Sequence, residues 1–396
     1  MPWRRGTRPK VWIGTLAGLL SLPWLVGAEP APGSASSEMQ RLLQTVAPLL
    51  PLAMDERTWS DPTRRGAIRQ NLESLAQAGA LLGRHAASRD LGFRALSRSL
   101  AADIGRTRDL YARGALEQAR VSMLEITGTC AACHARLPAA RQASAPSLPE
   151  ALMAELSLHQ RSQVWMATHR FDKALEVWEA ALGDEMQPPS RLDMDGYLLD
   201  YMTIGLRVSQ DPARVRENLA RFARRPDMPV YLARHLSRWN TALLAVEADP
   251  ATPDPLAHAR ALALAEGVPR PALLGREQTV YDIVASSLLL GFIEEGGAEP
   301  GRLAEAYYLL GVVEARSVDS YWLPQAEHHL EAAIRLAPGS PAAADAYALL
   351  EEYVVVGFGG ANEEALPRDA WERLQELDQL IRAQRAESAE ELPAEP

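Results

Sequence analysis

Residues 116–138 read LEQARVSMLEITGTCAACHARLP, and this stretch decides how the first part of the chain folds. Six of its residues recur at spacings of three or four and so share one helical face: Leu116, Ala119, Met123, Ile126, Cys130 and His134. Such spacing predicts an α-helix with a single buried face. Pro138 cannot continue a helix, so we expect the helix to end before it.

The motif Cys130-Ala-Ala-Cys133-His134 lies at the end of this helix and holds the two cysteines of the chain. Two cysteines exclude a disulfide scaffold and a four-thiolate metal site. The arrangement Cys-x-x-Cys-His is the attachment signal for c-type haem. Two thiols one helical turn apart can add to the two vinyl groups of a haem, and the next imidazole can then bind the iron. We expect one covalent haem c, with His134 as proximal ligand.

Other interpretations of the motif are a thioredoxin-type redox pair, a zinc site and a chance match. A redox pair needs a strand–helix context, which the sequence does not predict, and a zinc site needs two more good ligands. An export signal at the N-terminus favours haem attachment, because it directs the chain to the compartment where haem is attached.

Three further helices precede the motif helix and show the same three-four spacing of apolar residues. Their apolar faces carry Met39, Leu42, Val46, Leu49 and Ala53; then Ile68, Leu72, Leu75, Leu82 and Ala86; then Phe93, Leu96, Leu100, Ile104 and Tyr111. A turn is expected at 59–62, Asp90 can cap the third helix, and Gly114 ends it. Four long helices with short connections predict an up-and-down four-helix bundle over 37–138.

A Cys-x-x-Cys-His motif on the last helix of a four-helix bundle resembles the cytochrome c prime group, the class II c-type cytochromes. The resemblance covers about residues 37–140. It implies an iron that is either five-coordinate and open, or six-coordinate with a methionine near the start of the first helix. Met39 stands at that position.

The bundle topology also limits which residues can face the other side of the iron. The end of the fourth helix lies beside the start of the first, the end of the second and the start of the third. Met39 and His85 are therefore the candidate distal ligands, with Leu42, Leu43 and Phe93 as apolar neighbours. An open iron is the third possibility. The remaining histidines are isolated, or paired at 328–329 where one can face inward, and are expected at the surface or in a core; they are His159, His169, His235, His258, His328 and His329.

The first 28 residues have the pattern of an export signal. Residues 1–10 are basic, residues 11–25 are apolar, and Val26-Gly27-Ala28 offers small residues for cleavage after Ala28. This pattern predicts a cleaved signal peptide, a flexible mature N-terminus at 29–36 and a periplasmic protein. The alternative is an uncleaved membrane anchor, which the short apolar stretch and Pro23 argue against.

The chain after the motif helix is predicted to be a second, helical domain. Residues 139–150 are rich in Ala, Ser and Pro and are expected to form a linker, and 387–396 an acidic disordered tail. Helices are expected at 151–167, 171–183, 191–207, 211–224, 228–246, 255–266, 273–294, 300–316, 322–336, 340–355 and 367–386.

Part of this region resembles a divergent tetratricopeptide domain, in which small residues recur where paired helices pack closely. Ala326, Ala333 and Pro338 have the spacing of a second repeat helix, and Leu310-Gly311 supplies the pair of the first. A second match runs from Arg170 to Ala181, whereas 190–300 matches poorly. The resemblance implies a tetratricopeptide-like α-solenoid over 151–386, and the alternative is a generic α-solenoid.

Charge is divided unevenly between the two halves. Residues 29–148 hold 15 Lys and Arg against 11 Asp and Glu, and residues 149–396 hold 22 against 40. The acidic second half would repel a nucleic acid, so no nucleic-acid partner is expected.

Together these features predict a periplasmic mono-haem cytochrome that transfers single electrons rather than an enzyme. Its helical-repeat domain would dock it to a redox partner protein, because concave repeat surfaces commonly bind proteins. The alternative is an open-iron haem protein that binds or senses NO or CO, or reacts with peroxide. A scaffold protein with a structural haem is a further possibility, and the membrane is a partner only if the signal segment stays uncleaved.

Overall fold

The computed structural model describes residues 35–85, 91–135, 153–154, 156–248, 253–264, 277–316, 325–357 and 366–390. Every regular element in these ranges is a helix and none is a strand, so the expected all-α class is confirmed. Among the described helices, none is long and apolar enough to cross a membrane. The predicted signal peptide at 1–28 and the predicted linker at 139–150 lie outside the described residues.

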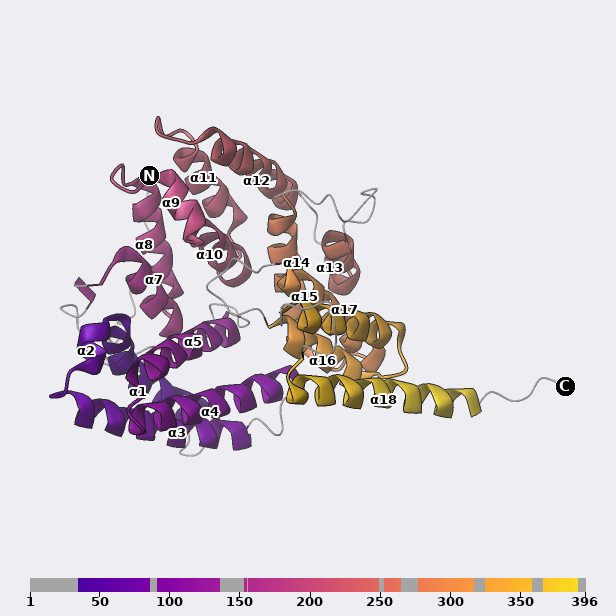
Figure 1. Ribbon diagram of the computed structural model, residues 1–396. Coiled ribbons are helices and arrows are strands. Elements are labelled where there is room, and N and C mark those ends of the chain that lie inside the picture. The colour runs from indigo at the N-terminus through magenta and orange to yellow at the C-terminus, as the bar shows by residue number, and fades with distance from the viewer. Residues whose placement is uncertain are drawn as a thin grey trace, which may run out of the picture.

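The N-terminal helices pack around one another in a closed circuit (Figure 1). They are α1 (Ala35–Met54), α2 (Glu56–Ser60), α3 (Arg65–His85), α4 (Leu91–Ala112) and α5 (Leu116–His134). α1 packs on α3, α3 on α4, α4 on α5, and α5 returns to α1. The leucines and isoleucines of the predicted apolar faces fill the space between them, and Leu49, Ile68 and Leu75 are fully buried.

A short helix, α2, precedes the turn expected at 59–62 and includes its first two residues. Asp55 caps it, because its carboxylate accepts hydrogen bonds from the backbone N–H groups of Arg57 (3.3 Å) and Thr58 (3.2 Å). Trp59 is completely buried, and its Nε1 donates to the Leu116 carbonyl at 2.9 Å. The ring of Tyr111 meets it edge to face. α2 therefore fixes the start of the motif helix.

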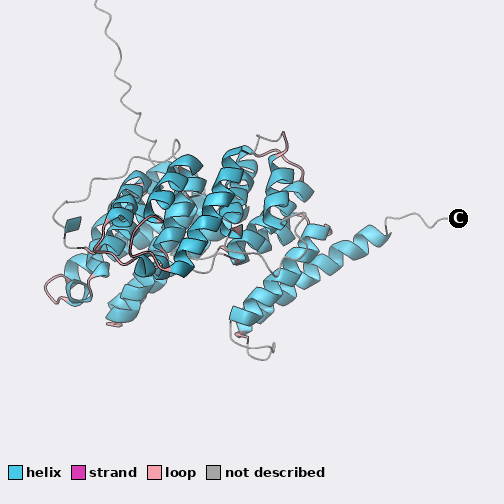
Figure 2. Cartoon of the chain, turned by 90° about the horizontal axis from the view of Figure 1, so that it is seen from above, coloured by secondary structure: helices cyan, strands magenta, loops and turns pink. Residues whose placement is uncertain are grey.

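The C-terminal helices continue as an array that curves away from the first group and returns to it (Figures 1 and 2). They are α7 (Leu158–Ala167), α8 (Phe171–Gly183), α9 (Pro189–Met194), α10 (Tyr197–Thr203), η3 (Ile204–Val208), α11 (Pro212–Phe222), α12 (Val230–Ala248), α13 (Pro255–Leu264), α14 (Gln278–Glu295), α15 (Pro300–Ala315), α16 (Ala326–Leu336), α17 (Pro341–Gly357) and α18 (Arg368–Glu390). Their apolar faces form two clusters, one centred on α8–α12 and the other on α13–α18.

The prediction of a single helix at 191–207 is wrong, because the structure divides this segment into α9, α10 and the π-helical turn η3. Gly196 separates α9 from α10 with φ of +78°, a conformation that glycine adopts without strain. Within η3, a β-carbon at Gly205 would overlap the Val215 side chain of α11. The close approach of α11 coincides with the wider π-helical turn.

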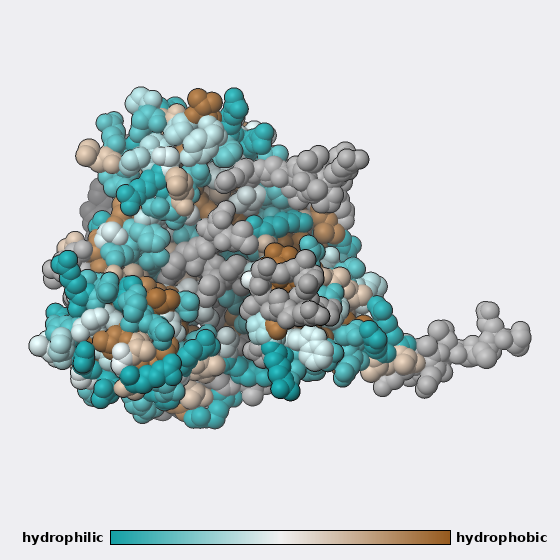
Figure 3. Space-filling view, in the orientation of Figure 1, coloured by the Kyte–Doolittle hydropathy of each residue, from teal (hydrophilic) through white to brown (hydrophobic). Residues whose placement is uncertain are grey.

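At the other end, α18 continues to Glu390, so residues 387–390 are helical rather than part of the predicted tail. The described surface seen in Figure 3 is mostly hydrophilic, with separate hydrophobic spots rather than a continuous band.

The described helices of the two groups meet where α7 packs on α5 and α1, and where α16 packs on α4 (Figure 1). Where α5 packs on α7, the two apolar clusters share residues: Ala131 of α5 and Ala135 just after it belong to the cluster of α8–α12, while Val164 and Ala167 of α7 belong to the cluster of the N-terminal helices. The end of the motif helix is thus shared between both groups.

Candidate haem site

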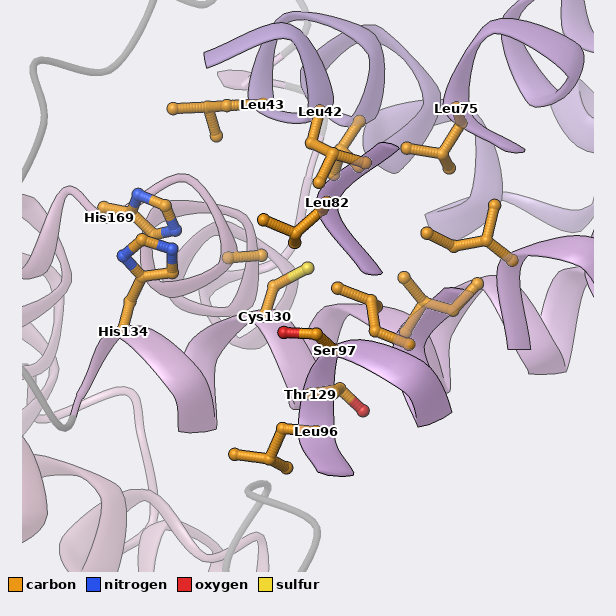
Figure 4. Close-up of a pocket in the computed structure, with 15 residues that line it drawn as sticks. Leu42, Leu43, Leu75, Leu82, Leu96, Ser97, Thr129, Cys130, His134 and His169 are labelled. Carbon is orange, nitrogen blue, oxygen red and sulfur yellow. The ribbon is translucent and has the colours of Figure 1, made fainter. Parts of the chain in front are cut away.

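α5 brings the motif to the edge of an apolar cleft between the N-terminal helices (Figure 4). Cys130 and His134 are four residues apart and therefore lie on the same face of α5. The Cys130 thiol points into the cleft, and its side chain is half-buried. Cys133 lies in the same helical turn, and its side chain is outside the described part of the chain.

The cleft is open to solvent on one side, and the cavity between its side chains measures about 30 Å³. Aliphatic side chains from four helices form most of its lining: Leu42, Leu43 and Val46 from α1; Leu75 and Leu82 from α3; Leu96, Leu100 and Ile104 from α4; and Ile126 from α5. Polar groups enter through Ser97, Thr129 and the two histidines 134 and 169. An apolar slot with few polar groups is the usual surrounding of a bound organic cofactor.

His134 is buried, with 6% of its surface exposed. Neither of its ring nitrogens has a hydrogen-bond partner among the described residues. Buried polar atoms are almost always paired in folded proteins, so the unpaired nitrogens leave this imidazole available to bind a ligand. Burial lowers the pKa of His134 to about 4, which keeps the imidazole neutral at pH 7, in the form that binds a metal.

A second histidine, His169, lies directly against His134, as Figure 4 shows. The two rings are stacked with centroids 3.2 Å apart and planes 23° from parallel. His169 is also 6% exposed, and its Nδ1 has no hydrogen-bond partner in the described structure. Burial, and then the neighbouring His134, lower its pKa well below the usual value. The prediction that His169 is isolated is therefore wrong.

The backbone explains how His169 reaches the cleft. It follows the end of α7 with φ of +60°, a left-handed conformation that few residues other than glycine adopt, histidine more readily than most. Its N–H donates to the Met166 carbonyl at 3.0 Å, and the Arg170 N–H donates to the Trp165 carbonyl at 2.7 Å. This pair of bonds is the Schellman ending of a helix, with histidine at the position that glycine usually occupies.

The predicted distal ligands belong to elements that border the cleft. Met39 lies near the start of α1, three residues before Leu42, and His85 is the last residue of α3, three after Leu82. The side chains of Met39, His85 and Phe93 are outside the described residues, so their roles stay predictions.

The other histidines occupy different surroundings. The ring of His159 lies 2.7 Å from the Gln163 amide nitrogen and meets the Tyr197 ring edge to face. His329 is buried beside Tyr307 whereas His328 is half-buried, as the expectation of one inward residue requires. In the described lining of the cleft, the histidines are His134 and His169. No group of three or more His, Cys, Asp or Glu suited to a bare metal ion occurs among the described residues.

The residues around the cleft fit a covalent haem. A thiol enters an apolar slot, an imidazole one turn further along the same helix face has unpaired nitrogens, and both belong to the motif that attaches haem. Sequence reasoning identified Cys130 and His134 but missed His169, whose only local signal is a histidine at the end of one helix and before another. No known protein family, curated protein or solved structure matches this chain.

Proposed function

We propose that this chain is a periplasmic mono-haem c-type cytochrome that carries single electrons, with a helical-repeat domain that docks a partner protein. The observation that carries the proposal is the position of the motif. Cys130 and His134 line an apolar cleft, and the nitrogens of the buried His134 imidazole have no hydrogen-bond partner among the described residues.

The finer architecture belongs to this proposal. The circuit α1–α3–α4–α5 supports a four-helix bundle of the cytochrome c prime kind, because each long helix contacts two of the other three. The helix pairs α7/α8 and α15/α16 support two tetratricopeptide-like units.

The small residues of the tetratricopeptide pattern lie where these pairs pack. In α8, Ala174 and Ala181 are buried around Trp178, and in α16, Ala326 and Ala333 are fully buried. In α15, Gly311 lies so close to α16 that a β-carbon there would stand 2.5 Å from the Leu330 side chain. Small residues at the closest points of helix pairs are what the repeat requires.

The chain's own residues would hold the cofactor in three places. The Cys130 and Cys133 thiols would each add across one vinyl group, so that a C–S bond forms, the thiol hydrogen passes to the neighbouring carbon and no oxidant is consumed. His134 would supply the proximal nitrogen. When bound, haem supplies a one-electron Fe(III)/Fe(II) couple, whose potential depends on the axial ligands and on burial.

Covalent attachment is tested by producing the chain with a c-type cytochrome maturation system and analysing it after denaturation. We expect a haem-stained band and a mass increase of one haem. Cys130→Ala and Cys133→Ala should each leave one thioether, detected as a shifted pyridine haemochrome band, and the double variant should lose covalent haem. Ser97→Ala, which alters the cleft without removing a thiol, is the matched control and should keep both thioethers. A wild-type chain without covalent haem would overturn the proposal.

Electron transfer is separated from gas binding by adding carbon monoxide to the reduced protein. A low-spin ferrous spectrum that carbon monoxide leaves unchanged, with reversible one-electron reduction at an electrode, supports a carrier. A high-spin spectrum that shifts on adding carbon monoxide would instead assign the chain to the open-iron class.

The docking role is supported by the helical array and by its charge. Residues 149–396 carry an excess of 18 acidic over basic residues, which suits a partner with a basic contact surface. Because such contacts are screened by salt, electron exchange with a basic redox protein should slow as ionic strength rises.

A further inference from the structure

We propose that His169, at the junction of α7 and α8, is the second axial ligand of the haem iron. This inference rests on the proposed function, because it requires a haem held by Cys130, Cys133 and His134. It assigns the sixth coordination position to a residue outside the N-terminal helices, although that position was expected to be open or filled by Met39 or His85.

The first argument is position. His134 reaches the cleft from α5 and His169 from the end of α7, so two imidazoles from different helices meet at the cleft edge (Figure 4). Their rings lie face to face, with centroids 3.2 Å apart. An iron held by both would take one nitrogen from each ring, after the side chains turn from this stacked arrangement.

The second argument is the unsatisfied hydrogen-bonding capacity of both rings. Both nitrogens of His134 and Nδ1 of His169 are buried without a hydrogen-bond partner among the described residues. A ring with neither nitrogen bonded, as in His134, is unusual for a histidine that serves only in a core, because burying a polar group without a partner is unfavourable. Two such rings pressed together are therefore better explained as ligands than as packing.

The third argument is the backbone at His169. Glycine is the common residue at this position of a Schellman ending, because a side chain there is strained in the left-handed region. Such strain collects at ligand-holding positions. His169 adopts this left-handed conformation, and the ring it carries lines the cleft rather than facing solvent.

If His169 binds the iron, the haem joins the N-terminal helices to the helical-repeat array. His134 belongs to the motif helix and His169 to the first helix pair of the repeat array, so one iron would hold both together. Two imidazoles would also leave no open position for carbon monoxide or NO, which favours the carrier among the functions considered.

The test uses the full-length, haem-loaded protein and compares His169→Gly with wild type. Glycine suits the left-handed backbone, so this variant should fold while losing the ring. We expect wild type to show low-spin ferric electron paramagnetic resonance and a near-infrared charge-transfer band characteristic of two histidines. His169→Gly should become high-spin and bind carbon monoxide, and added imidazole should restore the low-spin spectrum.

Control variants make the outcome specific. His258→Ala removes a histidine from α13, away from the cleft, and should leave the spectra unchanged. Met39→Ala and His85→Ala test the other candidates, and a sulfur-to-iron charge-transfer band lost in Met39→Ala would assign methionine instead.

Failure of this inference can be told apart from failure of the proposed function. If haem stays covalently attached in His169→Gly and the low-spin spectrum is unchanged, His169 is not a ligand and the cytochrome assignment stands. If the wild-type chain carries no covalent haem at all, both are overturned.

Discussion

Asp282, in the first turns of α14, is a carboxylate held in an unfavourable environment. It is buried, and it accepts hydrogen bonds from Gln278 Nε2 at 2.8 Å and from Arg316 Nη1 at 3.0 Å. Burial raises the pKa of Asp282 to about 6, and the bonds from Gln278 and Arg316 only partly oppose this. The folded chain therefore binds a proton at pH values where the unfolded chain has released it.

This shift gives a pH dependence with a definite sign. Between about pH 4 and pH 6 the folded state holds more protons, so Asp282 makes the free energy of unfolding fall as pH rises, by up to about 3 kcal/mol. Asp282→Asn should remove this part of the slope, as measured by urea unfolding at pH 4.5 and pH 7. Asp172→Asn, at an exposed carboxylate, is the control. Identical slopes in wild type and Asp282→Asn would contradict the prediction.

The candidate site could be predicted from sequence only where its residues are neighbours in sequence. Cys130, Cys133 and His134 form a motif with a chemical meaning of its own, whereas His169 gains its meaning from His134, 35 positions earlier, through the packing of α5 on α7. That contact is tertiary, and no helical periodicity encodes it. The one local sequence feature connected with this contact is the histidine after α7, at a position where helices often have glycine.

At the scale of elements, α15 and α16 pack more closely than ordinary side chains allow. A β-carbon at Gly311 would lie 2.5 Å from Leu330 Cδ2 and 3.5 Å from the Leu330 backbone nitrogen. The first contact is with a buried side chain and the second with the backbone of α16. An added β-carbon at Gly311 would therefore have to push α16 away from α15. Glycine at this point sets the distance between the two helices.

Gly311→Ala should therefore destabilise the chain by about 1–3 kcal/mol through overpacking. Gly291→Ala is the matched control, because Gly291 lies inside α14, is exposed and has no atom within 4 Å of an added β-carbon. There alanine should stabilise the helix by up to about 1 kcal/mol through its higher propensity. Thermal unfolding followed by circular dichroism measures both; the same sign of change in the two variants would refute this account.

Most helices could be predicted because their apolar spacing is a local property, and α8, α11, α12 and α15 begin and end close to their expected limits. The segment 191–207 could not, because its breaks depend on a left-handed Gly196 and on Val215 packing against Gly205. The spacing of apolar residues continues through such breaks, so it does not predict where they occur.

At the scale of the whole molecule, a buried ion pair joins the two clusters of the C-terminal array. Arg207 is in η3, whose apolar side chains belong to the cluster of α8–α12, and Glu314 is in α15, whose apolar side chains belong to the other cluster. Their side chains are 11% and 12% exposed, with Nη1 and Oε1 3.3 Å apart, and Arg207 Nε also donates to Ser286 at 2.8 Å. Removing one partner would leave the other charge buried.

Arg207→Met should cost about 3–5 kcal/mol, because the Glu314 carboxylate would lose its guanidinium in a buried place. Arg368→Met is the matched control: its ion pair with Glu372 lies within one helix, and 91% of the Arg368 side chain is exposed. That control should change the unfolding midpoint very little. Urea unfolding of the two variants measures the difference, and equal midpoints would show that the Arg207 pair does not hold the array together.

The contact between α4 and α16 has a consequence for the order in which the molecule is completed. These helices are separated by more than two hundred residues, yet α4 and α16 pack together, and Asp103 of α4 acts electrostatically on His328 of α16. Contacts between residues so far apart in sequence are costly to form, because the long chain between them must first be ordered, so we expect this contact to form late in folding. Because the apolar residues of α4 and α16 belong to separate buried clusters, we expect this contact to open without exposing either core to water.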